Sequence, residues 1–335
     1  MHVFSLLIAE WFRQNGRDLP WRSTTDPYYI WLSEIILQQT RVTQGRSYYQ
    51  KFIVNYPTVQ DLARASEQDI LNDWQGLGYY SRARNLHFTA KYVAYELNGK
   101  FPDSYDGLLQ LKGVGSYTAA AIASFAFNRE AAVVDGNVYR FLSRAFDLDT
   151  PIDSTPGKKQ FQELADVLIK GTDPAIHNQA MMEMGSIVCK PQPDCAECPV
   201  REHCISYSRN TVQERPVKSK KTKVRNRYFH YMVFESKEKT IVRQRTKKDV
   251  WQHLYEFPLI ETEKPEVPEL PELTELKRSE KITHILSHQR IEAVFYHFNG
   301  MPSTRASDWK VIDRKNIQDF PLPRIIDRYL EQTAG

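Results

Sequence analysis

The sequence predicts a multi-domain protein: an all-α domain that ends in a cysteine-containing loop, followed by a small α+β domain. Three observations support this fold class. Apolar residues recur at helical spacing through the first 208 residues, all four cysteines lie between residues 189 and 204, and strand-like segments begin only after residue 227. The length of 335 residues allows two or three domains.

The composition is that of an ordinary globular protein, with 41% apolar and 26% charged residues, and it argues against global disorder. The longest nearly apolar stretch, residues 119–127, is far shorter than the roughly 20 residues that cross a bilayer. The apolar residues 3–9 lack the basic start and the cleavage site of a signal peptide. We expect a cytoplasmic protein, associated with the nucleoid if the source is bacterial.

The first part of the chain contains seven segments with helical spacing, separated by turn signals such as Tyr56-Pro57-Thr58. We expect helices over residues 4–12, 29–37, 62–71, 86–97, 117–127, 138–146 and 161–169. Aromatic and β-branched residues predict strands over residues 228–234, 240–245, 282–286 and 291–298, and residues 323–330 predict a final helix.

Two segments have a strong charge bias. Residues 209–227 contain eight basic residues and one acid, which fits either a solvated linker or a segment that faces phosphates. Residues 261–275 contain six acids and three prolines, and they predict an exposed acidic loop.

The four cysteines, Cys189, Cys195, Cys198 and Cys204, lie within 16 residues, and the remainder of the chain has none. A disulfide framework would connect distant segments, whereas four thiolates in one short loop suit a single metal centre. Either a [4Fe–4S] cluster or a structural zinc ion fits such a ligand set.

Residues 111–119 predict a tight turn between two helices, with glycines at Gly113 and Gly115. Glycines allow backbone N–H groups to approach a phosphate, and the following helix N-terminus favours an anion. An ordinary helical hairpin would have the same pattern.

Two carboxylates are candidates for acid–base chemistry. Glu34 shares a helix face with Ile30 and Leu37, so burial should raise its pKa toward that of a general acid, unless the side chain only lies at the edge of the apolar face. Asp135 follows an apolar run and precedes a helix, a pattern that also fits a simple N-cap.

Together these features resemble the helix-hairpin-helix DNA glycosylase superfamily, and four segments are similar to the A/G-specific adenine DNA glycosylases, the MutY family. The segments are residues 19–22 (Leu-Pro-Trp-Arg), 31–40, 76–86 and 178–185. The resemblance is strong over residues 1–208 and weaker beyond them. There are two departures from the family pattern: the first cysteine spacer has five residues where six are usual, and the usual Phe-Ser-His loop is Leu286-Ser287-His288.

The resemblance implies three parts. Residues 1–208 would form the glycosylase domain, with a six-helix barrel over about residues 25–131 and an iron–sulfur part made of residues 1–24 and 132–208. Residues 209–227 would be a basic linker. Residues 228–335 would be a Nudix-like domain that recognises 8-oxoguanine, and because residues 251–281 lack the metal-binding signature of Nudix hydrolases, we expect a recognition module.

The implied activity is hydrolysis of the N-glycosidic bond of adenine opposite 8-oxoguanine or guanine in duplex DNA, after base flipping and with acid catalysis. In this resemblance Glu34 protonates N7 of adenine, Asp135 stabilises the sugar cation, Tyr117 positions Asp135, and Asn137 supports the same network. Related bifunctional enzymes such as endonuclease III have a lysine at position 117, so Tyr117 implies a monofunctional glycosylase without strong lyase activity. We expect a monomer.

The resemblance also assigns residues that bind DNA and the cofactor. Gln39 and Tyr79 would fill the gap left by the flipped base, Thr40 would lie near 8-oxoguanine, and Gln179 would bind the adenine edge with Arg22 beside it. Glu183, one turn beyond Gln179, is expected to be structural. The remaining assignments are Gly113 and Gly115 for phosphate, Ser287 and His288 for 8-oxoguanine, and Cys189, Cys195, Cys198 and Cys204 for a [4Fe–4S] cluster.

Three other functions stay open at this point. A related glycosylase for a thymine mismatch would lack Glu34 and the C-terminal domain, and a non-catalytic iron–sulfur protein that binds DNA would lack Glu34 or Asp135. A nucleotide pyrophosphatase would need the missing Nudix signature.

Overall fold

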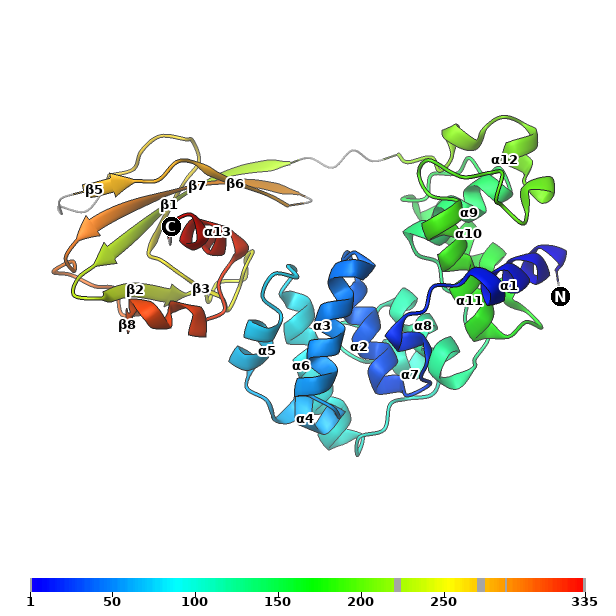
Figure 1. The fold of residues 1–335 in the computed structure, drawn as a ribbon, viewed down its shortest axis with the longest axis horizontal. Coiled ribbons are helices and arrows are strands. Elements are labelled where there is room, and N and C mark those ends of the chain that lie inside the picture. The colour runs from blue at the N-terminus through cyan, green and yellow to red at the C-terminus, as the bar shows by residue number, and fades with distance from the viewer. Residues whose placement is uncertain (1, 220–223, 270–274, 287, 334–335) are drawn as a thin grey trace. The chain divides into compact units, whose positions relative to one another are not determined.

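The structure is a computed structural model that describes residues 2–219, 224–269, 275–286 and 288–333. It contains two compact units. One consists of Met1–Arg64 and Phe88–Lys220, and the other of Ala65–His87 and Lys221–Gly335. Figure 1 shows the elements of both, and each unit is described by itself below.

The first unit is helical. Its α-helices are α1 (Val3–Asn15), α2 (Pro27–Leu37), α3 (Val42–Asn55), α4 (Val59–Arg64), α7 (Tyr105–Leu109), α8 (Ser116–Phe127), α9 (Gly136–Ala145), α10 (Thr155–Ile169), α11 (Pro174–Glu183) and α12 (Ile205–Ser208). Short 3-10 or π segments are η1 (Pro20–Arg22), η2 (Tyr92–Glu96), η3 (Met184–Val188), η4 (Arg201–His203) and η5 (Val212–Glu214). Helix α6 (Ser81–Lys91) contains the division between the units at residue 87.

Five predicted helices are confirmed: α1, α2, α8 and α9 within three residues at each end, and α10 with a start six residues before the predicted one. The single helix predicted over residues 62–71 is wrong, because Ser66 caps a separate helix α5 (Glu67–Asp73) by accepting from the N–H of Asp69. The helix predicted over residues 86–97 instead begins at Ser81 and ends in the π segment η2.

Two long helices, α3 and α11, were not among the predicted segments. Helix α3 buries only Gly45, Tyr49 and Phe52, so polar residues dilute its apolar spacing. Helix α11 has polar residues on its buried surface, including Asn178 and Glu183, which removes the amphipathic pattern.

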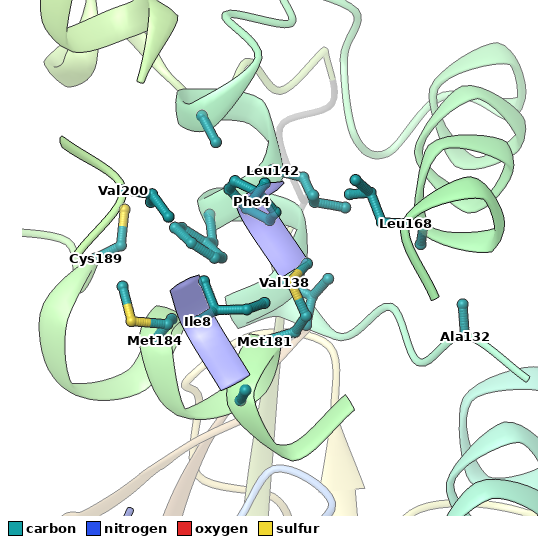
Figure 2. Close-up of a cluster of buried hydrophobic side chains, with 14 of the residues drawn as sticks. Phe4, Ile8, Ala132, Val138, Leu142, Leu168, Met181, Met184, Cys189 and Val200 are labelled. Carbon is teal, nitrogen blue, oxygen red and sulfur yellow. The ribbon is translucent and has the colours of Figure 1, made fainter. Parts of the chain in front are cut away.

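The apolar core around the cysteine loop joins segments that are far apart in the sequence. Figure 2 shows Phe4 and Ile8 of α1 packed with Val138 of α9 and Met181 of α11, with Cys189 close by. Because Asp135 caps α9, this core fixes the N-terminus of that helix relative to α11.

Helices α2 and α8 pack closely because α8 carries a run of buried alanines, residues 119–121. Small side chains allow the two backbones to approach, and Gln38 donates a hydrogen bond to Thr118 at 3.2 Å across the contact. This packing brings Glu34 of α2 and Tyr117 of α8 to the same cavity.

The second unit contains two sheets. One has the order β4 (Leu259–Thr262), β1 (Arg225–Glu235), β7 (Gln289–Asn299) and β5 (Glu275–Arg278), with β6 (Ile282–Ile285) also paired to β7. The other has the order β3 (Tyr255–Glu256), β2 (Lys239–Gln244) and β8 (Trp309–Asp313). The four predicted strands correspond to β1, β2, β6 and β7, and the predicted final helix is α13 (Arg324–Thr333), after the short η6 (Arg314–Asp319).

Aromatic packing fixes α13 against the larger sheet. The ring of Tyr329 stacks on that of Phe295 in β7, with centroids 3.8 Å apart and an interplanar angle of 3°. Strands β1 and β7 run parallel, and their paired residues Tyr231 and Phe295 are also stacked.

The predicted acidic loop is partly wrong, because Glu261 belongs to strand β4 and forms an ion pair with the buried Arg227 at 2.6 Å. Arg227 binds Asp249 as well, at 2.7 Å. Of the remaining predicted loop, residues 263–269 are mostly exposed and form no strand, and residues 270–274 lie outside the described residues.

Residues 65–87 join the C-terminal segment in the second unit. Gln75 donates a hydrogen bond to Asp327 at 2.7 Å, and Tyr80 donates one to the backbone oxygen of Leu322 at 3.3 Å. Among the described residues, no helix has both the length and the apolar character required to cross a membrane.

Candidate active site

A cavity of about 280 Å³ in the first unit contains most of the predicted catalytic residues. Its walls come from residues 17–25, α2, α8, the start of α9, and α11 with η3. The predicted residues in these walls are Arg22, Glu34, Thr40, Tyr117, Asp135, Asn137 and Gln179.

Glu34 is buried in this cavity, with a relative exposure of 5%. Ile30 and Leu37 of the same helix also line it, as the spacing predicts. Burial raises the pKa of Glu34 to about 7, helped by the charge of Asp135 and opposed by a hydrogen bond from Tyr117 and the charge of Arg22. The carboxyl group is therefore about half protonated at neutral pH, as a general acid requires.

Tyr117 donates its hydrogen bond to Glu34. Burial, and then the negative charges of Glu34 and Asp135, raise the pKa of its phenol well above 10. The phenol therefore stays protonated and acts as a hydrogen-bond donor, and it is not a nucleophile at neutral pH.

Asp135 is the N-cap of α9 and also lines the cavity, so the N-cap interpretation is confirmed and is compatible with a catalytic role. Its Oδ1 accepts from the backbone N–H groups of Asn137 at 2.9 Å and Val138 at 2.7 Å, and its Oδ2 accepts from the Asn137 side chain at 2.9 Å. Burial raises the pKa of Asp135, and these hydrogen bonds oppose the rise. They also fix the carboxylate at the cavity wall.

Gln179 lines the cavity from α11, and its neighbour Asn178 holds that helix in place. Asn178 accepts from the N–H of Val133 at 3.0 Å and donates to the backbone oxygen of Ala131 at 2.8 Å. These bonds connect α11 to residues 131–133, in the segment without regular secondary structure that leads to Asp135.

Gly185 allows η3 to approach α9 closely. A Cβ at this position would lie 2.5 Å from the backbone oxygen of Asn137, a distance that backbone atoms cannot accommodate. The glycine at the end of the sequence segment 178–185 therefore has a packing role beside the site.

Arg22 lines the cavity as predicted, but it belongs to an ion-pair cluster that sequence analysis missed. Glu183 is 1% exposed and binds Arg22 at 2.8 Å and Arg17 at 2.7 Å. Burial alone would raise the pKa of Glu183, but the hydrogen bonds from the two arginines outweigh it and hold the pKa at about 2. A buried glutamate needs a cation, but the burial of Glu183 is visible only in the structure, so no sequence signal indicates Arg17.

Gln39 and Thr40 follow Gln38, the C-cap residue of α2. Gln39 is exposed and has a φ of 54°, a left-handed conformation that costs a non-glycine residue on the order of 1–3 kcal/mol. Thr40 lines the cavity, and its hydroxyl donates to the backbone oxygen of Gln38 at 3.3 Å. The left-handed backbone of Gln39 is strain of the kind that is common at functional sites.

The second unit has a separate cavity of about 360 Å³, which brings Tyr79 and His288 together. Trp251 and His284 line it as well, with their rings 5.4 Å apart. Tyr79 also has a left-handed φ, 49°, and is 40% exposed. The β6–β7 hairpin that carries His288 is confirmed, but Ser287 lies outside the described residues.

Gly113 and Gly115 form the predicted turn before α8. Gly113 has a φ of 84°, and Gly115 is the N-cap of α8 with open space where a Cβ would be. This geometry leaves the N-terminus of a 12-residue helix open, as contact with a phosphate would require.

The four cysteines line one cavity, and no disulfide joins them. Its other walls are mostly apolar, and Arg144 donates to Cys189 Sγ at 3.6 Å. Throughout the described ranges, no three His, Cys, Asp or Glu side chains are close enough to hold a single metal ion. The donor set, four cysteine thiols around one mostly apolar cavity, fits a [4Fe–4S] cluster and also suits zinc.

Comparisons with known proteins agree with this geometry. Residues 32–170 match the HhH-GPD superfamily of base excision DNA repair proteins, and residues 230–332 match the NUDIX domain. The chain is 30% identical to the adenine DNA glycosylase of Buchnera aphidicola subsp. Schizaphis graminum over 99% of both chains. It is 43% identical to the human adenine DNA glycosylase, over 60% of this chain and 39% of the human one.

Solved structures match the helical part. A thermostable thymine-DNA glycosylase has 32% identity and a TM-score of 0.57, and the match covers 62% of this chain and 96% of that one. An endonuclease III–DNA complex has 23% identity and a TM-score of 0.52, over 62% of this chain and 95% of that one, which supports the fold. Because a relative aligned over nearly its whole length is an adenine DNA glycosylase, and both domains match, the chain belongs to the adenine DNA glycosylase family, the MutY family of the helix-hairpin-helix superfamily.

Proposed function

We propose that this protein is a monofunctional glycosylase that releases adenine mispaired with 8-oxoguanine or guanine in duplex DNA. The observation that carries the proposal is the pair of carboxyl groups, Glu34 and Asp135, in one cavity. Burial raises the pKa of Glu34 to about 7. The relatives that align with nearly the whole chain are adenine DNA glycosylases.

The base must first leave the helix stack, at a cost of a few kcal/mol. Gln39 and Tyr79 are the residues that fill the resulting gap in this proposal, and their strained backbones present exposed side chains. In the cavity Gln179 binds the adenine edge, since its amide supplies both a donor and an acceptor.

The proton of Glu34 goes to N7 of adenine, which makes the base a better leaving group. The C1′–N9 bond then breaks with its electron pair going to the base, and the sugar becomes an oxocarbenium ion. Asp135 faces this cation as a carboxylate, by electrostatic attraction or by a transient covalent bond. Water adds at C1′ and returns its proton to Glu34, which leaves an abasic site.

Tyr117 occupies the position at which bifunctional relatives carry a lysine. A lysine amine forms a Schiff base with the sugar and leads to strand cleavage, whereas a phenol cannot. The raised pKa of Tyr117 keeps the phenol neutral, which supports a reaction that stops at the abasic site.

The cysteine loop is proposed to hold a [4Fe–4S] cluster through Cys189, Cys195, Cys198 and Cys204. Ligation by these four residues would connect the two ends of the loop, and the bound cluster would stabilise the fold. The proposed mechanism uses no electron from it.

The test is the identity of the released base. Duplexes that contain A opposite 8-oxoguanine, G, C or T, and T opposite G, are incubated with excess protein, and free bases are quantified. We expect adenine release opposite 8-oxoguanine and G. Release of thymine opposite G, without adenine, would instead support the activity named for the thymine-DNA glycosylase structure.

A further inference from the structure

Glu183 is the most completely buried charged side chain at the wall of the Glu34 cavity, and the mechanism above gives it no role. We propose that Glu183 is a positioning residue for adenine excision: it holds the guanidinium of Arg22 at the cavity wall and compensates its charge. This inference rests on the proposed function.

The geometry of the cluster supports the proposal. Arg17 makes a two-pronged contact, with Nε 2.7 Å from Oε1 and Nη2 2.7 Å from Oε2 of Glu183. Arg22 approaches the same carboxylate with Nη2 2.8 Å from Oε2, and it also donates to the backbone oxygen of Arg17 at 2.8 Å. Arg22 therefore binds the carboxylate of Glu183 and the backbone of Arg17, and Glu183 also binds the backbone N–H of Arg17.

The two arginines differ in their surroundings. The Arg22 side chain is 16% exposed, whereas that of Arg17 is 38% exposed and also donates to Ser186 at 2.8 Å. The positive charge of Arg22 acts on Glu34 and lowers its pKa. Glu183 lies 2.8 Å from Arg22, and its carboxylate is ionised at neutral pH because its pKa is about 2. Its negative charge therefore compensates the positive charge of Arg22.

The groups that face Glu34 come from each neighbouring element. Tyr117 on α8 donates a hydrogen bond, Asp135 at the start of α9 contributes a negative charge, and Arg22 on η1 contributes a positive one. Helix α3 contributes the apolar Val42 to the wall. Arg17 and Glu183 line the same cavity, and Arg17 is also paired with Glu183. Of the charges that act on the pKa of Glu34, those of Asp135 and Arg22, only that of Arg22 is paired with Glu183.

The expected consequence concerns the pH profile. Adenine release needs protonated Glu34, so the single-turnover rate of the wild-type protein should fall as the pH rises through about 7. In Glu183→Gln the charge of Arg22 is uncompensated, which lowers the pKa of Glu34. The falling limb of the pH–rate profile should therefore move by about one pH unit to lower pH. At pH 8 the rate should be about tenfold below wild type, while at pH 5.5 it should be nearly equal.

Two further variants separate charge from structure. Arg22→Gln removes the cation, so its falling limb should move to higher pH. The double variant Arg22→Gln with Glu183→Gln should return the limb close to the wild-type position, whatever its absolute rate. Glu163→Gln, a matched loss of one negative charge at a 65% exposed site on α10, should leave the limb unchanged.

The experiment measures single-turnover adenine release from a duplex with A opposite 8-oxoguanine between pH 5 and 9, for these proteins at saturating concentration. Opposite shifts in the two single variants and their cancellation in the double variant support the proposal. A rate that drops equally at every pH, or a limb that does not move, overturns it. If Glu183→Gln fails to fold, Arg22→Gln alone must still shift the limb upward. If the wild-type protein itself releases no adenine, the proposed function has failed, and not the role of Glu183.

Discussion

The phenol of Tyr117 donates a hydrogen bond to the carboxyl group of Glu34, inside a cavity that Asp135 also lines. The two residues come from α8 and α2, which pack through the alanines of α8. The bond lowers the pKa of Glu34, but burial outweighs it. The site therefore keeps a buried carboxyl group that can hold its proton at neutral pH, at a cost in stability.

That cost predicts a stabilised variant. A carboxyl group whose pKa rises from 4.5 to about 7 on folding binds its proton more tightly in the folded state. Stability then falls as the pH rises from about 4.5 to 7, by about 3 kcal/mol in all. Glu34→Gln removes this penalty, so its thermal midpoint relative to wild type should be clearly higher at pH 8 than at pH 4.5. An equal difference at both pH values would show that Glu34 is not protonated in the folded state.

The residue at position 117 should decide the reaction type. Tyr117→Lys introduces an amine whose pKa burial would lower, so a fraction of it is neutral and nucleophilic. We expect strand cleavage and a protein–DNA adduct that borohydride traps. Tyr117→Phe is the control and should give neither product. The absence of an adduct with Tyr117→Lys would mean that the rest of the cavity, and not this side chain alone, determines the outcome.

The cysteine loop should contain iron. Four thiolates around one apolar cavity predict about four iron atoms per chain and broad visible absorption in protein purified without oxygen. Cys198→Ser should lower the iron content and the thermal midpoint together. Zinc in place of iron in the wild-type protein would contradict the assignment.

The second-unit cavity should discriminate the base opposite adenine. His288 lies at its edge with Tyr79, and a lost contact to a base typically costs about 1–3 kcal/mol. We expect His288→Ala to weaken binding to A opposite 8-oxoguanine more than to A opposite G. The measurement is the ratio of the two affinities at one salt concentration, because phosphate contacts contribute equally to both. An unchanged ratio would assign the discrimination to other residues, such as Thr40.

Local sequence patterns were sufficient to predict part of this site. Glu34 stands on an apolar helix face, and Asp135 stands between an apolar run and a helix, so both assignments depend on residues within one turn. The turn at Gly113 and the β6–β7 hairpin are local as well. The helices α1, α9 and α10 follow the same logic, because each has one apolar face. Helices α2 and α8 are buried over consecutive residues on all sides, and their apolar composition is a local signal as well.

Contacts between distant segments could not be predicted in this way. Arg17 and Glu183 are separated by 166 positions, and nothing near either residue indicates the other. The left-handed backbones of Gln39 and Tyr79 have no sequence signal, since glycine and asparagine are the usual residues there. The association of residues 65–87 with the C-terminal segment likewise depends on contacts such as Gln75 with Asp327.

In the proposed mechanism the proton of Glu34 drives the release of adenine. The most direct measurement is the single-turnover rate of adenine release from a bound duplex with A opposite 8-oxoguanine, for wild type and Glu34→Gln. The amide keeps the shape of the side chain but has no acidic proton, so the rate should fall by about 10²–10⁴-fold while the affinity for the duplex stays within about tenfold. A variant that still releases adenine within tenfold of the wild-type rate would show that the general acid is another group.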